Sequence, residues 1–101
     1  MSTTARTRTV TIRNRLGLHA RPAMAFVDTA NTYNSEVRVY REDDQTRGNP
    51  NGDGVDGKSI MQMMMLAATQ GTRLMITAKG DDAEQALEAL AELVESGFDE
   101  D

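Results

Sequence analysis

Apolar and polar residues alternate in three stretches of the chain, as they do in a strand that buries one face. These stretches cover residues 9–13, 36–41 and 72–78. In the second stretch the pattern places Val37 and Val39 inward and Glu36, Arg38 and Tyr40 outward. A further short strand is expected at 55–58, after a long polar stretch. The pattern therefore predicts four short strands.

Three other stretches carry apolar residues at the three- and four-residue spacing of a helix. The first follows His19, the second begins at Ser59 and is ended by Gly71, and the last runs from Asp81 to Gly97. The predicted order is β-α-β-β-α-β-α, and strands with one apolar face favour an antiparallel sheet with helices on one side, an α+β fold. The stripes of the first and last helices are Ala23, Phe26, Val27 and Ala30, and Ala83, Ala86, Leu87, Leu90, Leu93 and Val94.

Capping residues agree with these helix starts. Ser59 and Asp81 are good N-cap residues, and Gln62 and Glu84 follow three positions later, as in a capping box. His19 takes the N-cap position of the first helix. Pro22 (N3) then falls in the first turn, where a missing N–H is harmless. Each predicted helix therefore begins at a residue suited to its N-terminus.

A chain of 101 residues predicts one domain. Residues 1–8 are polar and small, and we expect a flexible N-terminal arm there, before a domain at 9–98 and an acidic tail at 99–101. Residues 41–56 are dense in Asp, Asn and Gly, which predicts a long hairpin loop.

Composition excludes several classes of site and partner. The chain has no Cys and one His, which argues against disulfides and a structural zinc site. No apolar run is long enough to span a bilayer, and residues 1–9 lack the apolar middle of a secretory signal, so we expect a cytoplasmic protein without membrane insertion. The net charge is −5, and no long basic stripe with interleaved aromatics suggests nucleic-acid binding.

The charge is nevertheless uneven, and its basic end holds the single histidine. Residues 1–27 contain five arginines and no acid. An imidazole at a helix N-terminus faces unpaired N–H groups and the positive end of the helix dipole, which favours a neutral, nucleophilic ring and also binds phosphate. Arg21 adds donors for phosphoryl oxygens. From spacing alone, two interpretations stay open: a phosphoryl-accepting His19, or a capping His19 beside a solvated Arg21.

Two further motif matches lack the context that they require. Residues 52–59 fit the P-loop pattern, but the preceding segment is polar rather than a buried strand, and Asp53 and Asp56 would repel phosphates. Residues 49–60 begin like a calcium loop but end at Ile60, where a bidentate Glu is needed. We therefore expect no cofactor and no bound metal.

The helix after Ser59 carries four methionines within five residues, which is too many apolar side chains for one face. Methionine is common on adaptable binding surfaces, so part of this helix is a candidate docking surface. The alternative is that these side chains are core. Ser59 itself is either a plain cap or a modification site, since phosphorylation there would change the docking surface.

Two segments resemble the HPr family, the histidine-containing phosphocarriers of the bacterial phosphotransferase system. Gly17-Leu18-His19-Ala20-Arg21-Pro22-Ala23 is similar to the family's active-site segment. Gly57-Lys58-Ser59-Ile60-Met61 is similar to its regulatory-serine segment. The resemblance extends from about Val10 to about Gly97, and the 41–56 hairpin is longer than is usual in the family.

The resemblance implies an open-faced β-sandwich, with a four-stranded antiparallel sheet and three helices on one face. It implies that His19 accepts a phosphoryl group on Nδ1 from Enzyme I, charged by phosphoenolpyruvate, and passes it to an Enzyme IIA domain, with Arg21 stabilising the group. Ser59 matches the serine modified by HPr kinase/phosphorylase, and Met61, Met64 and Ala20 match partner-docking positions. Such a protein is a monomeric carrier more than an enzyme. The alternative is a regulatory binding module of the same fold, switched at Ser59 or belonging to a nitrogen-type phosphorelay.

Overall fold

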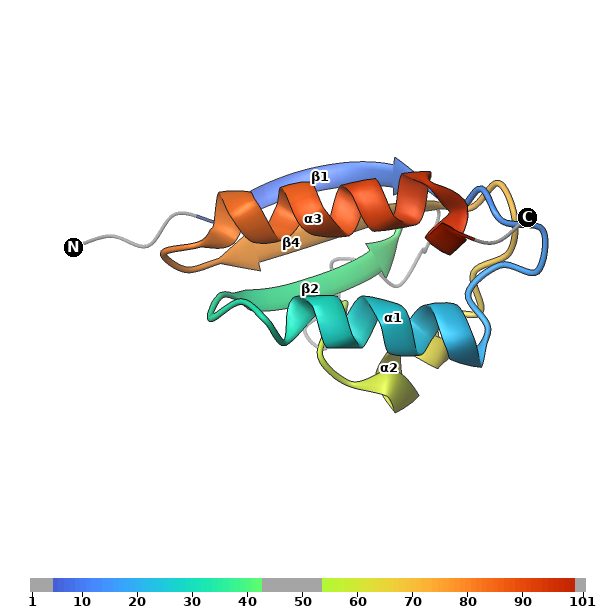
Figure 1. Cartoon of the computed structure of the whole chain (residues 1–101), viewed down its shortest axis with the longest axis horizontal. Helices are drawn as coiled ribbons and strands as arrows, with labels where there is room; N and C mark the ends of the chain where they lie inside the picture. The colour runs from blue at the N-terminus through green and yellow to red at the C-terminus, as the bar shows by residue number, and fades with distance from the viewer. Residues whose placement is uncertain (1–4, 43–53, 100–101) are drawn as a thin grey trace.

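Four strands form one antiparallel sheet, and the helices pack on one of its faces (Figure 1). The computed structural model describes residues 5–42 and 54–99. The sheet order is β1-β4-β2-β3, so the N-terminal strand lies at one edge and the shortest strand at the other. The predicted open-faced β-sandwich is confirmed. The elements are β1 (Ala5–Thr11), α1 (Ala20–Ala30), β2 (Glu36–Arg41), β3 (Val55–Asp56), α2 (Ile60–Met64), β4 (Arg73–Lys79), α3 (Ala83–Glu95) and a 3-10 turn at Gly97–Asp99.

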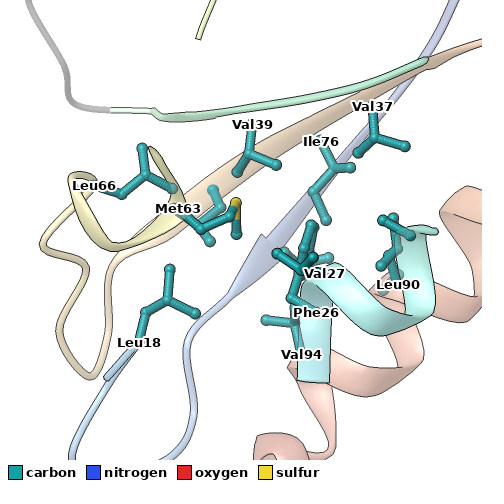
Figure 2. Packing of buried hydrophobic residues seen from close by; sticks show 14 of the residues in the cluster. Leu18, Phe26, Val27, Val37, Val39, Met63, Leu66, Ile76, Leu90 and Val94 are labelled. Atoms are coloured by element: carbon teal, nitrogen blue, oxygen red, sulfur yellow. The ribbon is translucent and has the colours of Figure 1, made fainter. Parts of the chain in front are cut away.

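The core lies between the sheet and the helices (Figure 2). Alternating residues of the central strands, such as Val37, Val39 and Ile76, are fully buried, as the period of a strand requires. The predicted stripe of α1 is buried throughout, whereas Leu93 of α3 is only partly buried at the margin of the core. The labelled side chains in Figure 2 come from the sheet, from all three helices and from the loops beside α1 and α2.

The first strand begins earlier than the sequence pattern predicts. We expected a strand at 9–13 after a flexible arm at 1–8, but residues 5–8 pair with β4, from Ala5 opposite Lys79 to Arg8 opposite Ile76. Their side chains are exposed on both sides, so no alternation of apolar residues marks them. The ladder to β4 is what orders them, because it satisfies their backbone groups. Residues 1–4 lie outside the described residues.

The helix that begins after Ser59 is shorter than predicted. It ends at Met64 rather than near Gly71, and the chain continues through turns that bury Leu66 and Ala68. The Ser59 hydroxyl caps it by accepting a hydrogen bond from the Gln62 N–H at 3.2 Å. The Gln62 side chain, however, accepts from the Asp56 N–H at 2.9 Å, so the reciprocal half of the predicted capping box is absent.

At the start of α3 the N-cap is Asp82, not the predicted Asp81, and its carboxylate makes no bond to the helix. Instead it accepts hydrogen bonds from the N–H groups of Asn34 and Ser35, each at 2.9 Å, and from the Ser35 hydroxyl at 2.5 Å. The Ser35 hydroxyl and the Asn34 N–H hold the pKa of Asp82 below its ordinary value, against a smaller opposing effect of desolvation. Asp82 therefore ties the start of α3 to the turn that enters β2.

Most of the predicted hairpin at 41–56 lies outside the described residues, at 43–53. Its ends are ordered by the pairing of β2 with β3, in which Arg38 lies opposite Asp56 and Val39 opposite Val55. The third strand is thus shorter than the predicted 55–58. Of the predicted acidic tail, Asp99 belongs to the final 3-10 turn and residues 100–101 are not described.

Candidate functional site

The loop between β1 and α1 is fixed by a second loop, between α2 and β4. Three backbone hydrogen bonds join them: Ile12 N–H to Thr72 O at 2.9 Å, Gly71 N–H to Ile12 O at 2.8 Å, and Leu18 N–H to Ala68 O at 2.9 Å. Figure 1 shows the two loops side by side at one end of the sheet. The residues just before α1 are therefore held at both ends of their loop.

Gly17 allows the two loops to approach this closely. Its φ is +71°, and a Cβ built on it would lie 2.5 Å from the Ala68 carbonyl oxygen. The turn around it is closed by Asn14, whose carbonyl accepts from the Gly17 N–H at 3.2 Å and whose amide donates to the Gly17 carbonyl at 2.7 Å. The Gly17 carbonyl also accepts the N–H of His19 at 3.0 Å. The backbone of His19 is thus placed by its own loop.

His19 occupies the N-cap position of α1, as predicted from the sequence. Its carbonyl accepts the first helical hydrogen bond, from the Ala23 N–H at 3.0 Å, and its side chain makes no capping hydrogen bond. The side chain is half-buried, whereas Ala20 and Arg21 in the first turn are exposed. The first turn contains no acidic residue, so the positive end of the helix is not neutralised from within it. The geometry can accommodate an anionic group beside the imidazole.

The second candidate segment lies on a neighbouring element. Helices α1 and α2 contact each other, and Ser59 begins α2. Ser59 is half-buried as a residue, and its hydroxyl accepts the Gln62 N–H, so it serves as a cap. The structure therefore brings the two predicted motifs onto adjacent helices.

The exposed large hydrophobic residues of the described chain are confined to this region. Of the predicted docking residues, Met61 is 81% exposed and Met64 is 44% exposed. Met65, one of the four methionines of the predicted docking surface, is 76% exposed, whereas Met63 is fully buried and belongs to the core. Leu16 and Met24 are exposed as well, at 70% and 49%, and were not predicted to lie on the surface. Met24 could have been found, because it falls outside the buried stripe of α1. We call Leu16, Ala20, Met24, Met61, Met64 and Met65 the apolar surface.

Basic residues border the same loop. Arg13 and Arg15 are exposed, and the Arg13 carbonyl accepts a hydrogen bond from the Gln70 side-chain amide at 3.0 Å. Together with Arg21 they give the His19 end of the molecule a positive rim. Within residues 5–42 and 54–99, no group of His, Cys, Asp and Glu side chains could hold a metal ion. Over these same ranges, no helix is long and apolar enough to cross a bilayer.

Fold and site together define a small open-faced sandwich that presents a histidine at the start of its first helix. Residues 6–96 match the family model described as the phosphorylation site of the HPr component of the phosphotransferase system. The chain belongs to the HPr family of phosphocarriers of that system. The resemblance predicted from the two sequence motifs is confirmed.

Relatives of two kinds match most of the chain. The phosphocarrier protein HPr of Pseudomonas aeruginosa is 47% identical over 91 residues, which cover 90% of this chain and 92% of that protein. The phosphocarrier protein NPr of Proteus mirabilis is 44% identical over 96 residues, which cover 93% of this chain and 96% of that protein. The crystal structure of HPr-C-His from Thermoanaerobacter tengcongensis superposes with a TM-score of 0.81 at 40% identity, covering 95% of this chain and 98% of that one.

Proposed function

We propose that His19 is the phosphoryl acceptor of this carrier. Its Nδ1 lone pair attacks the phosphorus of the group held by phosphorylated Enzyme I, and a P–N bond forms as the bond to the donor breaks. The same group then passes to an Enzyme IIA domain. This cycle runs in the cytoplasm, where phosphoenolpyruvate charges Enzyme I. The observation that carries the proposal is the placement of His19 at the N-terminus of α1, on a loop fixed by the 68–72 segment.

Arg21 stabilises the phosphorylated state in this proposal. It is exposed in the first turn of α1, two residues from the acceptor, and a guanidinium offers several N–H donors in a planar fork. Such a guanidinium stabilises the negative charge of the transferred phosphoryl group and contributes little to the stability of the fold. We therefore expect Arg21→Lys to slow transfer while leaving the unfolding midpoint of the protein nearly unchanged.

The apolar surface is proposed as the place where Enzyme I and the Enzyme IIA domain dock. Ala20, Met61 and Met64 lie on it, and the arginines at its border suit acidic groups around a partner's active site. A monomeric carrier leaves this surface open to successive partners. Methionine suits such use, because its flexible side chain adapts to surfaces of different shape.

Incubation of the protein with phosphoenolpyruvate and a cognate Enzyme I tests the carrier role. The wild type is expected to gain one acid-labile phosphoryl group, located at His19 by mass spectrometry under neutral conditions. His19→Ala is expected to gain none while keeping the wild-type circular dichroism spectrum and melting curve. Full labelling of His19→Ala, or none of the wild type, would refute the assignment.

Regulation at Ser59 is a separate proposal. The hydroxyl caps α2 beside the docking methionines, so a phosphate there would add negative charge at the edge of the apolar surface. Treatment with an HPr kinase and ATP should give an acid-stable phosphoserine that is absent from Ser59→Ala. No modification of the wild type by an active kinase would remove Ser59 from the mechanism and leave the role of His19 intact.

The nitrogen-type phosphorelay is the second candidate function, favoured by the similarity to the NPr of Proteus mirabilis. Rate measurements with two donor enzymes distinguish the nitrogen-type from the sugar-type system. The initial rate of phosphorylation of this protein is measured with a sugar-type and with a nitrogen-type Enzyme I at equal concentration. A faster rate with the nitrogen-type enzyme would assign the protein to that relay.

A further inference from the structure

The sulfur chemistry of this chain is concentrated on one exposed helix. The sequence has no Cys and seven Met, so thioethers are its only sulfur groups. Met61 is 81% exposed and Met65 is 76% exposed, whereas Met63 between them is fully buried. Met61 and Met65 are therefore open to a dissolved oxidant, whereas Met63 on the same short segment is shielded from it.

The two most exposed thioethers belong to α2 and to the turn that ends it. Met65 continues the helical path of α2, with φ −68° and ψ −15°. The Met65 N–H donates to the Gln62 carbonyl, three residues back, so the helix tightens into a turn here. Met61 and Met65 are the two most exposed thioethers of this segment, Met64 is less exposed, and Met63 is directed into the core. The exposed pair, Met61 and Met65, lies on the apolar surface next to α1.

We infer that Met61 and Met65 are oxidative modification sites, which a hydroperoxide converts to methionine sulfoxide. The sulfur attacks one peroxide oxygen, and an S–O bond forms as the O–O bond breaks. The other oxygen leaves as water, using the proton released from the transferred hydroxyl. Sulfur is oxidised by two electrons and the peroxide is reduced, so hydrogen peroxide is the only co-reactant.

The modification changes the surface without disturbing the fold. A sulfoxide is polar and chiral where the thioether was apolar, and it disrupts methionine-rich interfaces. Both side chains are largely solvated, so the added oxygen meets water rather than the core. In a docked complex the same oxygen would lose its water, and burial of an unpaired polar group weakens binding by roughly five- to a hundred-fold. This consequence for docking rests on the proposed function, whereas the modification itself does not.

Graded treatment of the full chain with hydrogen peroxide tests the assignment. Trypsin releases residues 59–73 as one peptide, because Lys58 and Arg73 are the flanking basic residues, and fragment ions resolve its four methionines. We expect Met61 and Met65 to be oxidised first and Met63 last, with an unchanged circular dichroism spectrum. Oxidation of Met63 at the same rate as the exposed pair, in protein that is still folded, would overturn the inference.

Binding to Enzyme I, measured by calorimetry, tests the consequence. The oxidised protein is expected to bind five- to a hundred-fold more weakly, and methionine sulfoxide reductase should restore the affinity. M61L/M65L, which keeps the exposed Met24 and Met64, is compared with itself before and after peroxide and should lose less affinity than the wild type, whereas M61Q/M65Q should bind weakly without treatment. If untreated protein binds and accepts phosphate but oxidation leaves its affinity unchanged, the inference that oxidation weakens docking is wrong. If untreated protein does not bind at all, the carrier proposal fails, and the oxidation map alone decides the modification sites.

Discussion

Replacement of Gly17 by Ala tests whether the close approach of two loops fixes the position of His19. The Cβ of alanine would lie 2.5 Å from the Ala68 carbonyl oxygen and 2.9 Å from the Thr69 Cα. Both are backbone atoms, which cannot rotate away as the end of a side chain could. One loop must therefore shift, and the hydrogen bond from the Leu18 N–H to the Ala68 oxygen is the contact nearest to the strain.

Three effects determine how much Gly17→Ala changes the free energy of unfolding. The left-handed conformation of Gly17, with φ +71°, costs an alanine about 1–2 kcal/mol. The lower entropy of the unfolded chain returns about 0.4–1 kcal/mol. Overpacking adds about 1–3 kcal/mol. We expect Gly17→Ala to lower the free energy of unfolding by about 1–4.5 kcal/mol.

Gly71 provides a matched control in the same pair of loops. Its φ is +90°, but a Cβ there would meet nothing within 4 Å. Gly71→Ala therefore keeps the conformational effects without the clash, and should cost about 0–1.5 kcal/mol. The difference between the two variants, about 1–3 kcal/mol, isolates the steric contact.

Urea unfolding of both variants measures this difference, and hydrogen exchange at the Leu18 amide reports on the loop itself. We expect exchange at Leu18 to be faster in Gly17→Ala than in Gly71→Ala, and phosphoryl transfer to be slower. Equal stability of the two variants would refute the reasoning, since it would mean that the loops do not meet at Gly17. Unequal stability with equal rates of transfer would show that the contact stabilises the fold without positioning His19.

Two further predictions concern other strained or charged positions. Ala67 is exposed with a φ of +51°, so Ala67→Gly should raise the free energy of unfolding by up to about 1.5 kcal/mol, measured in urea. The lowered pKa of Asp82 means that its bonds to Ser35 and Asn34 stabilise the fold above the ordinary pKa of Asp and are lost as the pH falls through the lowered one. Asp82→Asn should therefore be less stable than the wild type at pH 7 and should lose less stability on acidification. The variant of the exposed neighbour, Asp81→Asn, should follow the wild type. Parallel curves of unfolding free energy against pH for Asp82→Asn and the wild type would contradict this.

Local patterns in the sequence were enough to predict the helices, the sheet class and the position of His19. The stripe of α1 and the N-cap at His19 depend on neighbours within one or two turns, so periodicity reveals them. Features that depend on distant partners were not predictable in this way. Residues 5–8 have exposed side chains and are ordered only by pairing with β4, which lies about seventy positions further along the chain.

Asp82 shows the same limit at the level of a single side chain. From the sequence, an Asp before a helix is a cap, and Asp81 and Asp82 are equally suited to that role. The structure uses Asp82 to bind the backbone of Asn34 and Ser35, which lie 48 and 47 positions away. Only the packing of α3 beside the turn before β2 creates that partner, so no local rule could have chosen between the two residues.

The candidate site combines a rigid loop around His19 with an adaptable apolar surface, and these two parts differ in what they require of their residues. The backbone around His19 is fixed by three inter-loop hydrogen bonds and by a glycine that no larger residue can replace without strain. The surface beside it is instead rich in methionine, whose flexible thioether can follow partners of different shape. Leucine there would resist oxidation, but its branched side chain would adapt less well to a second partner. If the carrier proposal is right, the oxidation sensitivity of Met61 and Met65 is therefore a direct consequence of serving several partners with one surface.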